Sequence, residues 1–177
     1  YNRFVELEKK MALPLAIFIN KVLLGECTGI SIVDSTPLRV CRNQRIRMHR
    51  VFKGIAARGK CSMGWFFGFK LHLICNEKGE LLNFMFTPGD VDDRKPLEYK
   101  PFIRFIYGKL VGDKGYISQN LFQRLFVDGI QLITKLKSNM KGALMSVSDR
   151  LLLRKRALIE TINDELKNIA QIEHSRH

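Results

Sequence analysis

Residues 66–75 read Phe-Phe-Gly-Phe-Lys-Leu-His-Leu-Ile-Cys, which is the clearest strand in the chain. Every second side chain is apolar, with the period of two that a β-strand imposes, at Phe67, Phe69, Leu71, Leu73 and Cys75. The turn-forming run at 76–79 and a second apolar run at 80–87 complete a predicted β-hairpin. The fold therefore contains a sheet, and the rest of the chain must supply its neighbours.

Two shorter apolar runs, 30–34 and 109–113, read as strands buried on both faces, and each ends in an aspartate. A third such strand is predicted at 130–135. Helical patterns are predicted at 1–24, after Asp93 to about 107, at 118–128 and at 148–170. Strands that alternate with helices in this way predict an α/β fold with a mixed sheet flanked by helices.

The composition restricts the class of protein further. The 177 residues include 46% hydrophobic residues, enough for the core of one domain, and no apolar run is long enough to span a membrane. The four cysteines form no CxxC pair, which disfavours a zinc ribbon or a disulfide framework. A net charge of +13 favours a polyanionic partner, most often nucleic acid.

The positive charge is concentrated between residues 39 and 60, a stretch without Asp or Glu that we expect to form an irregular loop. Such a run is often a solvated surface, but in a chain this basic it also predicts contact with DNA phosphates. Its expected DNA-binding residues are Arg39, Arg42, Arg45, Arg47, Arg50 and Lys53. Trp65, which follows this run, either packs in the hairpin or stacks on an exposed base.

Three acids stand out by position: Asp34 and Asp113 at the ends of predicted strands, and Glu160 within the last helix. Carboxylate oxygens at strand ends are the ligands that Mg²⁺ and Mn²⁺ prefer. Each acid also has a plain structural interpretation, as a turn residue or as a solvated ion-pair partner. A second acidic group (Asp90, Asp92 and Asp93) reads as a helix cap or as further metal ligands.

Motifs around these acids carry a family resemblance. In chain order they are Asp34–Leu38, Gly68–His72, Pro88–Arg94, Gly112–Tyr116 and the helical pattern Arg156-x3-Glu160-x6-Lys167. Together they resemble the DDE transposases of bacterial insertion sequences, with two departures. Leu153 stands where that family usually has tyrosine, and we expect the family's N-terminal DNA-binding region and the rest of its C-terminus to lie outside this sequence.

The resemblance implies an RNase H-like fold with the element order β-β-β-α-β-α-β-α. It also implies that Asp34, Asp113 and Glu160 are catalytic and hold two Mg²⁺ (or Mn²⁺) ions, which support phosphoryl transfer on DNA. Lys114 borders this site in the family pattern, and Arg156 and Lys167 would hold DNA phosphates beside it.

We accordingly expect an N-terminal helical segment at 1–28 and an RNase H-like DDE catalytic domain at 29–177, within a longer protein. The expected function is metal-dependent cleavage and transfer of double-stranded DNA at insertion-sequence ends. The protein would act as a homo-oligomer on DNA, in the cytoplasm at the bacterial nucleoid and not at a membrane. Two alternatives remain open: a transposase-derived DNA-binding protein without catalysis, and a hydrolytic nuclease of the same fold.

Overall fold

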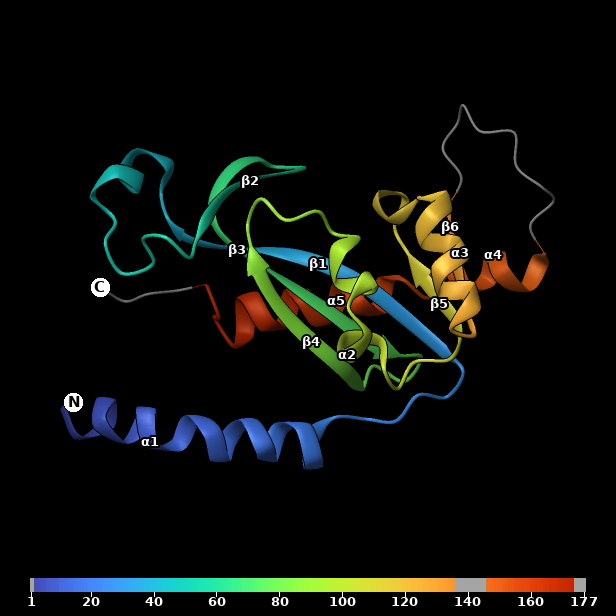
Figure 1. The fold of residues 1–177 in the computed structure, drawn as a ribbon, viewed down its shortest axis with the longest axis horizontal. Helices are drawn as coiled ribbons and strands as arrows, with labels where there is room; N and C mark the ends of the chain where they lie inside the picture. The colour runs from blue at the N-terminus through green and yellow to red at the C-terminus, as the bar shows by residue number, and fades with distance from the viewer. Residues whose placement is uncertain (1, 136–145, 174–177) are drawn as a thin grey trace.

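The computed structural model describes residues 2–135 and 146–173, and its centre is a six-stranded sheet with helices on both faces (Figure 1). The strands are β1 (Ile30–Cys41), β2 (Ala57–Cys61), β3 (Gly64–Asn76), β4 (Leu81–Pro88), β5 (Gly108–Gly112) and β6 (Ile130–Thr134). The sheet order is β2-β3-β1-β5-β6. β4 also pairs with β3, along the half of that strand that β2 leaves free.

Strand directions identify the fold. β1 and β4 each run antiparallel to β3, the strand between them. β1, β5 and β6 run parallel to one another. Parallel neighbours need crossover connections, and α3 (Gln119–Val127) supplies the one between β5 and β6. Three antiparallel strands followed by two parallel ones form an RNase H-like sheet, so the predicted fold class is confirmed.

Both faces of the sheet are covered, which explains the continuous apolar runs of its central strands. On one face, α2 (Lys100–Ile103) and α3 pack through Phe102 and Leu125 against Leu110. On the other face, α4 (Val147–Arg154) and α5 (Ala157–Asp164) pack through Leu153 and Ile159. In Figure 1, α5 runs behind the strands.

β1 is much longer than predicted. It continues through Pro37 to Cys41 because β3 pairs with it along its whole length, from Ser31 to Cys41. β5 ends at Gly112, so the second half of β1 has a neighbour on one side only. A proline, which has no N–H to donate, is tolerated at such an edge.

The basic stretch 39–60 is also more ordered than the predicted loop. It includes the end of β1, a 3₁₀ helix at Asn43–Met48 and β2. Phe52 packs edge-on against Phe69, with ring centroids 5.4 Å apart, and its ring stacks on His49. These contacts partly cover Phe67 and Phe69, which begin the predicted apolar face of β3.

The helix predicted after Asp93, to about residue 107, is two short turns, a 3₁₀ turn at Lys95–Glu98 followed by α2. Pro96 and Pro101 explain the interruption, because proline donates no hydrogen bond and restricts the residue before it.

The predicted long helix at 148–170 is broken between α4 and α5, and Glu165–Ile169 continues as a π-helical turn. On an unbroken helix Leu153 and Ile159 would point about 120° apart. The break lets both side chains enter the same core. The 3-4-3 spacing of Ile159, Ile162, Leu166 and Ile169 predicts an apolar helix face, but Ile169 at its end is 78% exposed.

α1 (Asn2–Phe18) and a π-helical turn at Ile19–Leu23 precede the sheet, close to the helix predicted at 1–24. The division of the chain at residue 28 stays a prediction. No helix within residues 2–135 and 146–173 combines the length and the apolar character needed to cross a membrane.

Candidate active site

The two predicted aspartates lie side by side across neighbouring strands. In the parallel pairing of β1 and β5, Ile32 is opposite Val111. Two residues further along each strand are Asp34 and Asp113, so both reach the same edge of the sheet. Asp113 also caps the turn at Lys114–Tyr116, because its Oδ1 accepts from the backbone N–H of Lys114 over 2.6 Å.

Arg156 connects the third predicted acid to this edge. Its Nη1 donates to Asp113 Oδ1 over 2.9 Å, and its Nη2 donates to Glu160 Oε1 over 2.8 Å. The arginine side chain is 20% exposed, whereas the Asp113 and Glu160 side chains are about half exposed. One guanidinium therefore binds a strand-end acid and a helix acid together.

Asn163 makes the corresponding link to Asp34, with Nδ2 donating to Asp34 Oδ2 over 3.0 Å. No role was predicted for Asn163 from the sequence, although it lies three residues after Glu160 on the same helix. A signal was present: Arg156, Glu160 and Asn163 are spaced four and three residues apart, which brings them to one face of α5.

The electrostatics of Asp34 differ from those of an ordinary surface acid. The pKa of its carboxyl is raised from 3.8 to about 6, chiefly by burial and to a smaller degree by the nearby Asp113 and Glu160 charges, while Arg156 opposes the rise. Desolvation therefore dominates. A cation placed beside Asp34 would relieve this cost.

A cleft of about 230 Å³ opens beside these groups, and we call it the acid cleft. Asp34, Asp113 and Tyr116 line it, together with Lys60, Cys61 and Ser62 from the tip of the β2–β3 hairpin. A larger hollow of about 660 Å³ lies between the segments 24–27 and 99–107, and neither predicted aspartate lines it.

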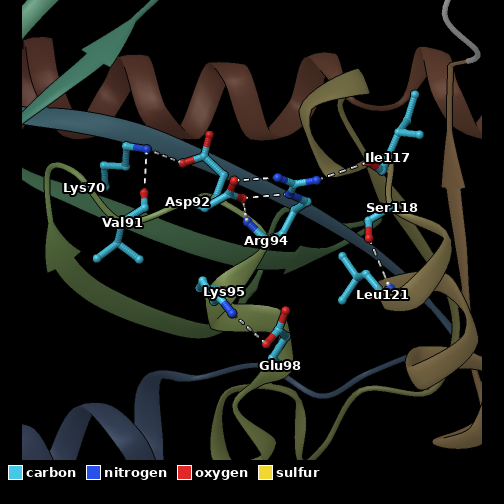
Figure 2. A network of polar contacts seen from close by, with 10 residues as sticks. Lys70, Val91, Asp92, Arg94, Lys95, Glu98, Ile117, Ser118 and Leu121 are labelled. Atoms are coloured by element: carbon cyan, nitrogen blue, oxygen red, sulfur yellow. Dashed lines mark hydrogen bonds and ion pairs between the residues drawn. The ribbon is translucent and has the colours of Figure 1, made fainter.

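Two members of the second acidic group, Asp92 and Asp93, lie in different environments, and Asp90 is exposed; Figure 2 shows the polar contacts around Asp92. Asp92 binds Arg94 through both carboxyl oxygens, at 2.8 and 2.6 Å, and these hydrogen bonds lower its pKa to about 2. Asp93 lines the acid cleft, where Lys70 Nζ donates to it over 2.8 Å and to the carbonyl of Val91. Lys70 thus balances the charge of Asp93.

The predicted DNA-binding residues are spread over a wider area. Six of them lie on the exposed segment from the end of β1 to the loop before β2: Arg39, Arg42, Arg45, Arg47, Arg50 and Lys53. Within the described ranges, none of these six forms an ion pair.

The remaining three predicted DNA-binding residues are Lys114, Arg156 and Lys167. The first two lie next to the acids, and Lys167 lies on the turn after α5. Lys114 is exposed directly after Asp113, and Arg156 contacts two acids. Lys167 lies 3.7 Å from Glu173, so its charge is partly balanced there.

The oxygen atoms around the three acids are of the kind that binds a divalent cation. The carboxylates offer hard oxygen atoms, and two further buried oxygens, Tyr116 Oη and Asn163 Oδ1, have no hydrogen-bond partner among the residues that the structure describes. Buried polar atoms of this kind call for an explanation, and a nearby ligand site is one. Across the described residues, however, no three His, Cys, Asp or Glu side chains form a ready-made metal cage. The cation that Asp113 and Glu160 now bind is Arg156.

An RNase H-like sheet with one acid on β1, a second directly after β5 and a third on α5 defines the class of this domain. The family model described as "Transposase DDE domain" matches residues 24–177, and the chain belongs to that family. No curated protein matches the chain.

Among solved structures, the chain is similar to the piggyBac transposase in a cryo-EM synaptic complex with hairpin DNA, at 15% sequence identity and a TM-score of 0.49. The match covers 78% of this chain and 30% of that chain. The present chain thus corresponds to less than a third of that transposase.

Proposed function

We propose that this domain cleaves DNA and transfers the resulting strand in a reaction that depends on divalent metal ions. The observation that carries the proposal is the convergence of Asp34 and Asp113 at one sheet edge, with Glu160 tied to the same edge through Arg156. A catalytic set needs such convergence from distant segments, whereas turn residues and solvated ion pairs do not.

Asp34, Asp113 and Glu160 would hold two Mg²⁺ or Mn²⁺ ions. When bound, such ions activate an attacking hydroxyl and stabilise the departing oxygen of the scissile phosphate. The burial of Asp34 keeps water from screening its charge, and Asn163 holds its carboxyl in a fixed orientation. Both effects favour a preorganised site.

The cations around the acid cleft would hold the DNA. Arg156 and Lys114 lie at Asp113. With a metal ion bound by that carboxylate, the Arg156 guanidinium would be free to bind a phosphate in bidentate fashion. The exposed arginines between residues 39 and 50 would follow the duplex backbone further out. Insertion-sequence ends as the substrate, homo-oligomeric assembly on DNA and action at the bacterial nucleoid all belong to this proposal.

The test is cleavage of a labelled DNA duplex in Mg²⁺ or Mn²⁺ by Asp113→Asn. This change keeps the shape of the side chain and removes its charge, so we expect a rate loss on the order of 10³-fold, with DNA binding retained. Asp90→Asn, which alters an exposed acid outside the acid cleft, is the matched control and should cleave normally. Equal cleavage by wild type and Asp113→Asn would contradict the proposal.

The Arg156 bridge supports one alternative, a DNA-binding protein without catalysis, because a guanidinium that permanently neutralises two acids would leave no use for metal ions. Intact DNA binding without cleavage by any variant would favour that alternative. Cleavage without joining of strands would favour a hydrolytic nuclease.

A further inference from the structure

The hairpin of β2 and β3 presents one face to the body of the protein and the other to solvent. On the inner face, Phe66 is 1% exposed, and Gly59 lies so close to Gly89 that a Cβ at Gly59 would collide with the Gly89 carbonyl oxygen. The hairpin is thus held firmly against the segment that follows β4.

The outer face carries Trp65, which is 52% exposed. Lys60 is its direct cross-strand partner. The Arg58 guanidinium lies 5.2 Å from the centroid of the indole ring, and the Lys60 ammonium 5.9 Å. The largest aromatic side chain of the protein is therefore half exposed, with two cations beside its ring. An aromatic surface for stacking and positive charges that attract phosphate lie together here.

This arrangement is continuous with the acid cleft. Lys60 itself lines the cleft, as do Cys61 and Ser62 at the hairpin tip, opposite Asp34 and Asp113. A nucleotide that is bound at Trp65 would accordingly lie at the rim of the site proposed above.

We infer that Trp65, Arg58 and Lys60 form a stacking site for an unpaired DNA base at the rim of the acid cleft. This inference rests on the proposed function, since it concerns the DNA strand that enters the same cleft. The indole ring would stack on the base, and the two cations would bind the adjoining phosphates. Bases inside a duplex are already stacked on their neighbours, so the site selects a frayed end, an overhang or an extruded base.

Trp65 is the single tryptophan of the chain, so its fluorescence reports this contact directly. In buffer with EDTA, a duplex with a single-stranded overhang should quench the fluorescence, and a blunt duplex with the same stem should not. In parallel, fluorescence anisotropy of labelled DNA gives the affinity for both duplexes.

We expect Trp65→Ala to weaken overhang binding by about tenfold or more, because that is the usual effect of removing one stacking aromatic. Binding of the blunt duplex should remain within about twofold, and Trp65→Phe should restore most of the affinity. Phe105→Ala is the matched control: Phe105 is 69% exposed with Arg104 at 5.2 Å from its ring, but it lines the larger hollow and not the acid cleft.

Unchanged overhang affinity in Trp65→Ala, with DNA binding intact, would overturn the inference and leave the proposed function standing. An equal loss for blunt and overhang duplexes would also overturn it, because the contact would then be to the duplex backbone. If wild type binds no DNA at all, the proposed function fails together with the inference. Should Trp65→Ala not fold, the wild-type comparison of quenching by the two duplexes still decides.

Discussion

Arg156 and Asp113 form a 2.9 Å ion pair although 43 positions separate them in the sequence. The pair joins α5 to the end of β5, and Asn163 joins the same helix to Asp34 on β1. One helix therefore contacts both strand acids and carries the third acid itself. The position of α5 on the sheet decides whether the three acids can act together.

Arg156→Gln tests whether this arginine competes with metal ions for Asp113 and Glu160. We expect Mn²⁺ to bind more tightly to the variant, because the competing cation is gone. Without metal the variant should lose about 1 kcal/mol of stability, a modest amount because both acids are half exposed. Isothermal titration with Mn²⁺ and urea unfolding in EDTA provide the two measurements. Weaker Mn²⁺ binding would mean that Arg156 supports the metal site.

Asn163→Leu tests whether Asn163 serves mainly to orient the Asp34 carboxyl for metal binding or mainly to stabilise the fold. The change keeps a similar volume. Loss of the hydrogen bond to the buried Asp34 carboxylate should cost about 1–3 kcal/mol, and removal of the buried, unpartnered Oδ1 should offset part of this cost, so the free energy of unfolding should fall only modestly. Mn²⁺ affinity should fall by about 10- to 100-fold, as is usual when a partner that orients a metal ligand is lost. Asn168→Leu, an exposed asparagine on the turn after α5, is the control and should leave both quantities unchanged. A large loss of stability with normal Mn²⁺ binding would refute this role.

Asp34 should make stability depend on pH in the direction opposite to that of a usual acid. Its folded pKa, about 6, is above the unfolded value of 3.8, so its contribution is fully present below pH 3.8 and is lost as the pH rises through 6. The loss amounts to at most about 3 kcal/mol.

Buried His72, whose pKa falls from 6.5 to about 4, acts in the opposite sense, because its contribution is present above pH 6.5 and is lost as the pH falls through 4. Urea unfolding of wild type and Asp34→Asn in EDTA isolates the aspartate. The variant should gain stability over wild type as the pH rises from 4 to 7. A constant difference across that range would rule out the raised pKa.

The basic segment before β2 should set the salt dependence of DNA binding. If Arg45, Arg47 and Arg50 each neutralise one phosphate, replacing all three with Gln should reduce the slope of log K against log salt by about 0.9 for each arginine. Filter binding of a duplex over a series of salt concentrations measures the slope. An unchanged slope would mean that these arginines do not contact DNA phosphates and that the segment is an ordinary solvated surface.

Much of the sheet could be predicted from the sequence, because local patterns specify it. The alternation in 66–75 and the short apolar runs ending at Asp34 and Asp113 gave the right strands in the right order. The extension of β1 to Cys41 was missed because it depends on pairing with β3, which lies far away in the chain. β2 was missed for a different reason: it pairs with the adjacent residues 64–68 of β3, but its own sequence, with Arg58, Gly59 and Lys60, lacks the apolar alternation that indicates a strand.

For the site, the acids could be predicted from the family resemblance, but the residues that hydrogen-bond to them could not. The contact between Asn163 and Asp34 spans 129 positions and depends on the break before α5, which no proline or glycine marks. Packing of Leu153 and Ile159 against the sheet causes that break, and packing is a tertiary effect.

The central claim, that Asp113 is a metal ligand in a DNA-cleaving site, is tested most directly by Asp113→Cys. A thiolate is a poor ligand for Mg²⁺, whereas Mn²⁺ tolerates sulfur better. We predict that this variant fails to cleave a labelled duplex in Mg²⁺ and recovers cleavage in Mn²⁺, while wild type cleaves in both. Equal activity of Asp113→Cys and wild type in Mg²⁺ would contradict the claim.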